Sequence, residues 1–313
     1  MSTGEERFQD VTSAPVDFLP HVALFFSVTL LGSSFVAARA IMEHSDAPAT
    51  LAFLRYFIAA ICLVPLALRR SQWQMRRADV LLALGLGVIQ FGLFHLFVNT
   101  ALQEIPAARG AVIFALIPIL TMLIAAAGGR DHVSWFMTVA AVLSFAGVSL
   151  AVGEKAFDPV VGGDSLWGEG LFFLAVCCGA TYNAFSARLY QRYSIAPVSL
   201  LAMLGGVIML LPFAAQEGLF TAGTGYSTDD WWLAIYLAVF GGTASMLLFN
   251  WGLRRLSPTR AAIWVPLSPI AATAFGALLL DEIITPLFLV GLACAVSGPM
   301  LVAWGRSRRQ RNG

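Results

Sequence analysis

The chain has 313 residues, of which 58% are hydrophobic and 12% are charged, and its mean hydropathy is +0.79. Soluble globular domains carry about a quarter charged residues, so this composition excludes a water-soluble protein. The chain is instead expected to lie in a lipid bilayer. The formal net charge is only +1, and no nucleic-acid partner is expected.

Ten apolar runs are each long enough to cross the bilayer, because a helix of about 20 residues spans a hydrocarbon core of about 30 Å. They cover residues 21–41, 48–68, 80–100, 107–127, 133–152, 168–189, 197–215, 231–251, 261–280 and 284–304. The connections between them are mostly short and leave no room for a folded extramembrane domain. The predicted fold class is therefore an all-α integral membrane protein of ten transmembrane helices.

The basic residues predict the orientation of these helices. With the N-terminus in the cytoplasm, 15 of the 19 basic residues fall in cytoplasmic segments and three in periplasmic ones. The positive-inside rule then places both termini in the cytoplasm. The polar N-terminal tail lacks the basic start of a cleavable signal peptide. Arginine makes up 18 of the 19 basic residues, which suits a GC-rich bacterial genome, so the expected location is a bacterial inner membrane.

The chain also repeats itself at an offset of 151 residues. FVNTALQEIPAARGAVIFALIPI, from Phe97, aligns with LFNWGLRRLSPTRAAIWVPLSPI, from Leu248. Identical polar or proline residues coincide in three places: Asn99 with Asn250, Arg109 with Arg260, and Pro118 with Pro269. Each half holds five helices, an odd number, so the second half is predicted to be inverted in the membrane, a common design in secondary transporters. Channels and membrane enzymes can also arise by duplication.

This repeat predicts five segments along the chain. They are a cytoplasmic tail (1–19), a first repeat (20–152), a periplasmic linker (153–167), a second repeat (168–305) and a basic cytoplasmic tail (306–313).

The segment LLGSSFVAARAIMEHSDAPATLAFLRYFIAA and the closing segment of each half resemble the EamA domains of the drug/metabolite transporter superfamily. The resemblance covers about residues 20–305. It implies two inverted five-helix repeats around an alternating-access cavity lined by helices 1–4 and 6–9. Members of this family include exporters of amino acids, among them aromatic ones, and of other metabolites. The segment CCGATYNAFSARLY departs from the family, which often has a Trp there.

Two ionisable residues lie within predicted spans, where charge is costly and usually functional. Arg55 lies about seven residues into the second helix and His95 near the middle of the third. His95 shares a helical face with Phe91 and Asn99 at spacings of four. That face suits the wall of a cavity for an amphipathic solute. Two other roles stay open: Arg55 could pair with a helix end, and His95 could be hydrogen-bonded between helices without touching solute.

No carboxylate lies in the central part of any predicted helix, because Asp79, Glu104, Glu169, Asp281 and Glu282 are all at helix ends. A pump for hydrophobic cations usually needs a buried anion, so cation extrusion is disfavoured. Arg55 and His95 instead suit a solute that carries a carboxylate or is zwitterionic. Any proton coupling would use His95, and facilitated diffusion is equally open.

Aromatic and amide side chains complete the candidate site. The predicted substrate-binding residues are Arg55, Phe91, His95, Asn99, Phe114, Tyr182, Asn183, Asn250 and Trp264. Pro118 and Pro269 each remove a backbone donor and are predicted to act as hinges in helices 4 and 9, although kinks that serve only packing are the alternative. The pairs at 205–206 and 241–242 are glycines and indicate close helix packing.

The predicted function is export of amino acids, including aromatic ones, or similar metabolites. The alternatives are multidrug or organic-cation efflux, or a membrane protein that does not transport. The sequence contains no GxSxG or HExxH motif and no paired intramembrane Asp, so no enzyme is expected, and no channel filter is legible. The four cysteines lie in apolar stretches and suggest no disulfide, metal or cofactor. The expected partners are a small solute and the bilayer, for a monomer or weak homodimer.

Overall fold

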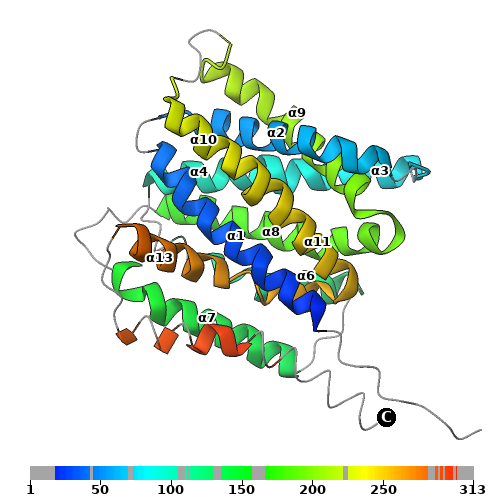
Figure 1. The fold of residues 1–313 in the computed structure, drawn as a ribbon. Coiled ribbons are helices and arrows are strands. Elements are labelled where there is room, and N and C mark those ends of the chain that lie inside the picture. The colour runs from blue at the N-terminus through cyan, green and yellow to red at the C-terminus, as the bar shows by residue number, and fades with distance from the viewer. Residues whose placement is uncertain are drawn as a thin grey trace, which may run out of the picture.

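The computed structural model describes residues 18–42, 45–69, 73–104, 110, 113–129, 135–156, 166–220, 225–280, 286–287, 290–291, 293–298 and 301. Every regular element within these ranges is helical (Figure 1). The helices are α1 (Leu19–Met42), α2 (Pro48–Arg69), α3 (Arg77–Gly87), η1 (Val88–Leu93), α4 (Phe94–Glu104), α6 (Ile117–Ala127), α7 (Trp135–Ala156), α8 (Leu166–Arg192), α9 (Ile195–Gln216), α10 (Thr228–Tyr236), η2 (Leu237–Ala244), α11 (Ser245–Arg255), α12 (Pro258–Ala262) and α13 (Leu267–Leu280). The predicted terminal tails lie almost entirely outside the described residues. Of the predicted linker, 153–156 belong to the end of α7 and 166–167 to the start of α8, and the rest lies outside the described residues.

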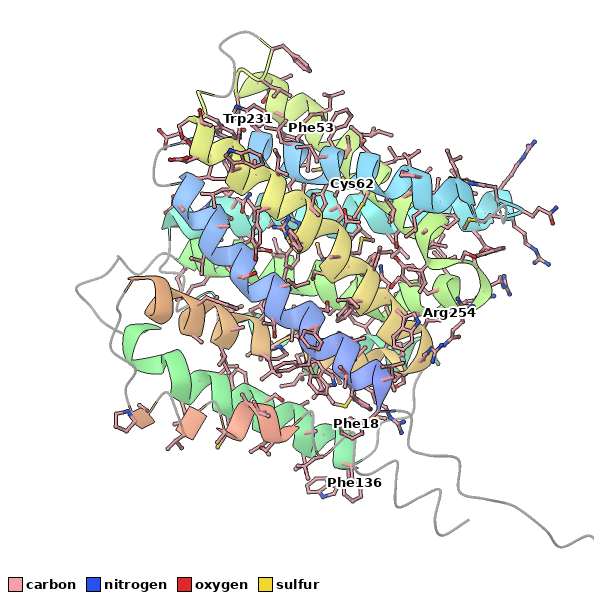
Figure 2. The ribbon with its side chains drawn as sticks, in the orientation of Figure 1. Phe18, Phe53, Cys62, Phe136, Trp231 and Arg254 are labelled. Atoms are coloured by element: carbon pink, nitrogen blue, oxygen red, sulfur yellow. The ribbon has the colours of Figure 1, made fainter. Side chains whose placement is uncertain are left out.

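Six stretches of the described chain are long and apolar enough to cross a membrane. They are Leu19–Ala38, Pro48–Leu68, Arg77–Ala101, Leu166–Arg192, Ile195–Gln216 and Thr228–Arg255. Two shorter apolar helices, Ile117–Ala127 and Trp135–Leu150, accompany them. The bundle also carries large apolar side chains on its outside, such as Phe136, which is 58% exposed (Figure 2). These features confirm a multi-pass membrane protein.

Helices 4 and 9 differ from the continuous spans expected from the sequence. A turn at 115–116 precedes α6, and a turn at 263–266 separates α12 from α13. Pro118 is the second residue of α6, where its missing N–H has no intrahelical acceptor to lose. Pro266 lies in the second turn. The prolines therefore stand at breaks and helix starts instead of inside bent helices. Of the predicted tenth span, 284–304, the structure describes residues 286–287, 290–291, 293–298 and 301, and all of them are helical.

The helices of the two halves of the chain interleave. The helix α2 packs against α9, α1 packs against α13 and α11, and α4 packs against α8. In Figure 1, α2 and α9 lie at one edge of the bundle, and α7 lies at the opposite edge beside the short helical pieces of 286–301. Each half thus buries its apolar surface mainly against the other half.

Several structural features recur at the 151-residue offset. The helices α3 and α10 begin 151 residues apart, at Arg77 and Thr228. Two π-helical segments, η1 and η2, interrupt the spans that follow these starts, and they end 151 residues apart, at Leu93 and Ala244. Two segments of such a rare conformation at matched positions reflect matched local packing.

The contact between α7 and residues 291–298 is reciprocal at the same offset. Ser144 Oγ donates to the carbonyl oxygen of Ala295 at 3.4 Å, and these residues are 151 apart. A Cβ atom built on Gly147 would collide with the backbone of Ala295, and one on Gly298 would collide with Ser144. Gly147 and Gly298 are themselves 151 residues apart. Ser144 thus meets Gly298, and their equivalents at the offset, Ala295 and Gly147, also meet. Such a reciprocal contact has the pattern that a two-fold axis produces.

The predicted close packing at the glycine pairs is confirmed between α3 and α9. A Cβ on Gly205 would collide with the carbonyl oxygen of Leu84, and one on Gly206 with Phe91. On the facing helix, a Cβ on Gly87 would collide with the carbonyl oxygen of Ala202. The two backbones therefore touch at this crossing.

We expect Gly87→Val to destabilise the folded protein by roughly 1–3 kcal/mol, because the new side chain must push α3 away from α9. The matched control is Gly85→Val, two residues away on α3, where an added Cβ has no neighbouring atom within 4 Å. Thermal unfolding of the purified variants in detergent compares them. Equal losses at the two positions would contradict the close crossing.

Candidate functional site

Arg55 is a buried cation in the centre of the bundle. Its side chain is 7% exposed. Its Nη2 donates to the carbonyl oxygen of Gly241 at 2.9 Å, and its Cζ lies 5.4 Å from the ring centroid of Tyr56. Its Nε is buried without a hydrogen-bond partner. In the described helices, Asp and Glu lie only within the first or last turn, so no carboxylate from these helices neutralises Arg55 at this depth.

Tyr56 connects Arg55 to His95. The Tyr56 hydroxyl lies 2.6 Å from His95 Nε2, while His95 Nδ1 lies 3.2 Å from the carbonyl oxygen of Gln90. A carbonyl can only accept, so Nδ1 carries a proton; in the neutral imidazole Nε2 then accepts from the Tyr56 hydroxyl. Gln90 Oε1 is buried without a partner. We call Arg55, Tyr56, Gln90, His95 and Gly241 the polar junction.

Aromatic rings border the polar junction. The ring centroid of Phe91 lies 4.9 Å from that of Tyr56 and 5.8 Å from that of Tyr182. The Tyr182 hydroxyl in turn lies 2.7 Å from the Tyr190 hydroxyl. Three of the predicted site residues, Arg55, Phe91 and His95, thus contact Tyr56, and a fourth, Tyr182, contacts Phe91.

The two predicted asparagines hold helices together. Asn99 Nδ2 donates to the carbonyl oxygen of Pro48 at 3.1 Å, and Asn250 Nδ2 donates to Ser199 Oγ at 3.2 Å and to Tyr190 at 2.8 Å. Each asparagine bonds a residue 51 positions before it, and the two bonds are related by the 151-residue offset. Asn250 is fully buried. These contacts tie α4 to the start of α2, and α11 to the start of α9.

The other predicted residues lie apart from the polar junction. Phe114 belongs to a second apolar cluster, in which its ring centroid lies 6.2 Å from that of Phe94. The ring centroid of Trp264 lies 5.7 Å from that of His21 and 6.5 Å from that of Phe25, near the start of α1. Asn183 is buried beside Tyr182 on α8 but belongs to neither hydrogen-bonded group. The hinge candidates Pro118 and Pro269 are the second and third residues of α6 and α13.

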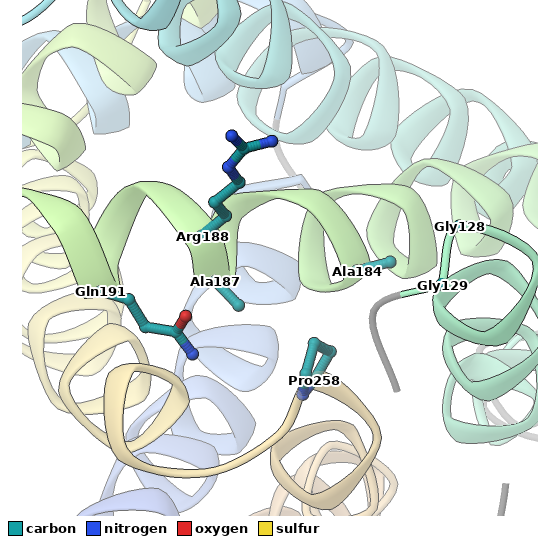
Figure 3. Close-up of a pocket in the computed structure, with 7 residues that line it drawn as sticks. All are labelled: Gly128, Gly129, Ala184, Ala187, Arg188, Gln191 and Pro258. Atoms are coloured by element: carbon teal, nitrogen blue, oxygen red, sulfur yellow. The ribbon is translucent and has the colours of Figure 1, made fainter. Parts of the chain in front are cut away.

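A hollow of about 360 Å³ lies elsewhere, at the C-terminal ends of α6 and α8 (Figure 3). It is lined by Gly128, Gly129, Ala184, Ala187, Arg188, Gln191 and Pro258. Ala187 and Gln191 point toward Pro258, while Arg188 leaves α8 in another direction (Figure 3). None of the predicted site residues lines this hollow.

Sequence reasoning missed three members of the polar junction: Tyr56, Gln90 and Gly241. Tyr56 looks like an ordinary aromatic of an apolar helix, and its role depends on which helix faces it. The repeat offers a signal for the other two, because Gln90 and Gly241 are 151 residues apart.

The polar side chains of the junction come from the first half alone. At the 151-residue offset, Arg55 corresponds to Gly206, Tyr56 to Val207, Gln90 to Gly241 and His95 to Met246. The second half supplies small or apolar residues there. Gly206 lies against Phe91, and Gly241 lies against Ser34 and Arg55. The two halves have matching helices, but the polar side chains of the junction all belong to the first half.

A bundle with six membrane-crossing stretches and a buried cationic, aromatic centre defines a multi-pass membrane protein with an intramembrane polar site. The model of the EamA-like transporter family matches residues 19–153 and again residues 166–304. The chain belongs to this family of transporters, within the drug/metabolite transporter superfamily.

Relatives of similar length support the assignment. A probable terminal-alkyne amino-acid exporter of Streptantibioticus cattleyicolor is 24% identical, over 90% of this chain and 92% of its own. The inner membrane transporter YedA of Escherichia coli is 25% identical, over 91% and 90%. A transporter of Archaeoglobus fulgidus is 22% identical, over 90% and 97%.

A solved structure described as "Crystal structure of protein" is similar with a TM-score of 0.74 at 16% identity, covering 92% of this chain and 98% of that chain. The two proteins share their fold.

We expect Asn250→Ala to lower stability by roughly 1–3 kcal/mol, because Tyr190 and Ser199 lose a buried partner. Asn183→Ala is the matched control, since Asn183 is also buried but joins neither hydrogen-bonded group. Thermal unfolding of the purified variants in detergent compares them. Equal losses in Asn250→Ala and Asn183→Ala would contradict this role of Asn250.

Proposed function

We propose that this protein is a secondary carrier that exports amino acids, aromatic ones included, or similar small metabolites by alternating access, without changing the solute chemically. The solute's carboxylate binds Arg55, and its apolar part rests on Phe91 and Tyr182. The observation that carries this proposal is Arg55: a buried guanidinium bonded to a backbone carbonyl, with an unpartnered Nε. A buried charge is costly unless it is paired, and a carboxylate in the solute provides that pair.

The aromatic surroundings of the polar junction favour a solute with an apolar side chain. Phe91 and Tyr182 are 5% and 4% exposed; the Phe91 ring lies next to that of Tyr56, and the Tyr182 ring lies next to that of Phe91. The Tyr56 hydroxyl and the His95 ring add polar groups to the same cluster, since the Tyr56 ring contacts Arg55 and the Tyr56 hydroxyl contacts His95. A solute with a charged end and an aromatic or aliphatic end therefore matches the junction. The relative named as a probable amino-acid exporter supports the same class of solute.

Alternating access would involve two inverted five-helix repeats, residues 20–152 and 168–305. Three observations support this architecture: the double family match, the π-helical segments at matched positions, and the reciprocal contact of Ser144 and Ala295. Solute sites of such carriers lie near mid-membrane, where the repeats meet. The Arg55–Gly241 bond joins the first half to the second, and Gly241 is near the middle of the span Thr228–Arg255.

The test is transport of radiolabelled L-phenylalanine by the purified protein in proteoliposomes. We expect Arg55→Gln to weaken transport roughly 10- to 100-fold, the equivalent of about 1.5–3 kcal/mol for a lost charge-assisted hydrogen bond. His95→Ala should also reduce transport strongly, and His95→Gln should keep part of it. Arg254→Gln is the matched control, because Arg254 is an exposed arginine at the end of α11.

A solute series examines the role of the carboxylate. Phenethylamine has the ring and the ammonium group of phenylalanine but no carboxylate, and tetraphenylphosphonium is a permanent cation. The proposal expects neither to be moved. If only the cations are transported, the protein is a cation pump and the reading of Arg55 is wrong. Single-channel recording on the same protein serves as a control for channel activity.

We also propose that the protein lies in a bacterial inner membrane, as a monomer or weak homodimer, with both termini in the cytoplasm. In a variant without native cysteines, Gln74→Cys should resist an impermeant thiol reagent in intact cells, because the α2–α3 connection faces the cytoplasm. Asp46→Cys, in the α1–α2 connection, should react. The opposite labelling pattern would invert the topology.

A further inference from the structure

We infer that Gly241 is a positioning residue: its carbonyl oxygen accepts a hydrogen bond from Arg55 until the solute's carboxylate takes its place. This exchange changes the hydrogen bonding of the π-helical segment η2. The inference rests on the proposed function, because it requires a carboxylate-bearing solute at Arg55. It adds a route from solute binding to helix movement.

The backbone of η2 leaves the Gly241 carbonyl available to Arg55. In an α-helix, the N–H of Ser245 would bond the carbonyl of Gly241, four residues earlier. Here the N–H of Ser245 bonds the carbonyls of Phe240 and Gly242 instead. Gly241 O accepts from Arg55 Nη2 at 2.9 Å. The side chain of another helix thus replaces the α-helical donor of this carbonyl.

The first half has the same arrangement at the 151-residue offset. The N–H of Phe94 bonds the carbonyl of Ile89, five residues earlier, instead of that of Gln90. The carbonyl oxygen of Gln90 instead lies 3.2 Å from His95 Nδ1, which donates to it. Gln90 corresponds to Gly241, and Phe94 corresponds to Ser245. A side-chain donor therefore reaches the same carbonyl position of both π-helical segments, and both donors, Arg55 and His95, contact Tyr56.

Only glycine fits at position 241. A Cβ there would collide with Ser34 Oγ and lie 3.1 Å from Arg55 Nη2. The missing side chain lets η2 approach both α1 and α2, so that the Gly241 carbonyl reaches the guanidinium. This close approach makes the carbonyl a neutral substitute for the oxygen of a carboxylate.

A carboxylate competes well for Arg55, because hydrogen bonds between two ionised groups are stronger than those to a neutral carbonyl. Once Arg55 turns to the solute, Gly241 O lacks a donor in a low-dielectric setting, which is costly. The N–H of Ser245 is the nearest α-helical donor for it. This change would move Ser245, whose hydroxyl donates to the carbonyl of Ser27 at 3.0 Å while Ser27 Oγ donates to the carbonyl of Ser245 at 2.7 Å. The movement is therefore passed to α1.

NMR can observe the Gly241 carbonyl directly. Protein labelled with ¹³C′-glycine and ¹⁵N-glycine gives one-bond correlations only for Gly-Gly pairs, of which the chain has four, at 128–129, 162–163, 205–206 and 241–242. Gly242→Ala removes the fourth signal and so assigns it. We expect saturating L-phenylalanine to shift the Gly241 ¹³C′ resonance and to leave the Gly128 signal in place. Phenethylamine should leave both in place.

The outcomes separate this inference from the proposed function. If L-phenylalanine binds and is transported while the Gly241 resonance does not move, the exchange is wrong and the proposed function stands. An equal shift with phenethylamine also overturns the exchange, because no carboxylate is then needed. If proteoliposomes transport no amino acid at all, the proposed function fails, and this inference fails with it.

A pair of variants adds a kinetic test. Gly241→Ala combined with Ser34→Gly makes room for the new methyl group but disturbs the hold on Arg55. Because the carbonyl of residue 241 then competes less well, Arg55 should bind L-phenylalanine more tightly, so both KM and maximal rate should fall severalfold. Gly242→Ala is the control, because a Cβ there meets Ala59 and Leu237 but neither Ser34 nor the Arg55 side chain. A simple packing role predicts less folded protein with unchanged KM, and that result would contradict the inference.

Discussion

Backbone groups inside a membrane must find hydrogen-bond partners within the protein, and the organisation of this centre follows from that constraint. Each π-helical segment takes an α-helical donor away from one carbonyl, at Gln90 in η1 and at Gly241 in η2. The replacement donors are His95 and Arg55. Two costly features of a membrane interior, an unsatisfied carbonyl and a polar side chain, thus satisfy each other. A polar solute can enter this arrangement because it offers the same kinds of groups.

Only part of this could be predicted from the sequence. The six long spans follow from apolar length, and the glycine pairs from their small size. Arg55 and His95 could be predicted as site residues, because ionisable residues are rare inside membranes. Tyr56 and the role of the Gly241 carbonyl were missed, because their importance comes from the helix that faces them. Asn99 and Asn250 were predicted from their polarity to contact solute, and that stays a prediction; their bonds to helix starts could not be predicted, because an amide that bonds a helix start looks the same in a sequence as one that faces a cavity.

The second half has helices matching those of the first but carries none of the polar side chains of the junction. Where α2 carries Arg55, the matched position of α9 is Gly206, and that glycine receives Phe91. Where η1 carries Gln90, η2 has Gly241, and the Arg55 side chain lies against this glycine. Large residues of one half are thus complemented by small residues of the other. A symmetric pair of arginines would place two like charges near mid-membrane, so one-sided chemistry is the less costly solution for a single anionic group.

The asparagine bonds indicate which parts can move. The helices α2 and α3 are joined by their connection at one end, and Asn99 ties α4 to the start of α2 at the other. Asn250 does the same for α9 and α11. Each hairpin is thus held together at both ends. In the proposed alternating access, one hairpin would move against the other at the crossing where Gly87 and Gly205 lie against the backbone of the facing helix. The Arg55–Gly241 hydrogen bond joins α2 of one hairpin to η2 of the other, so a solute that replaces it, as proposed, would act between the two hairpins.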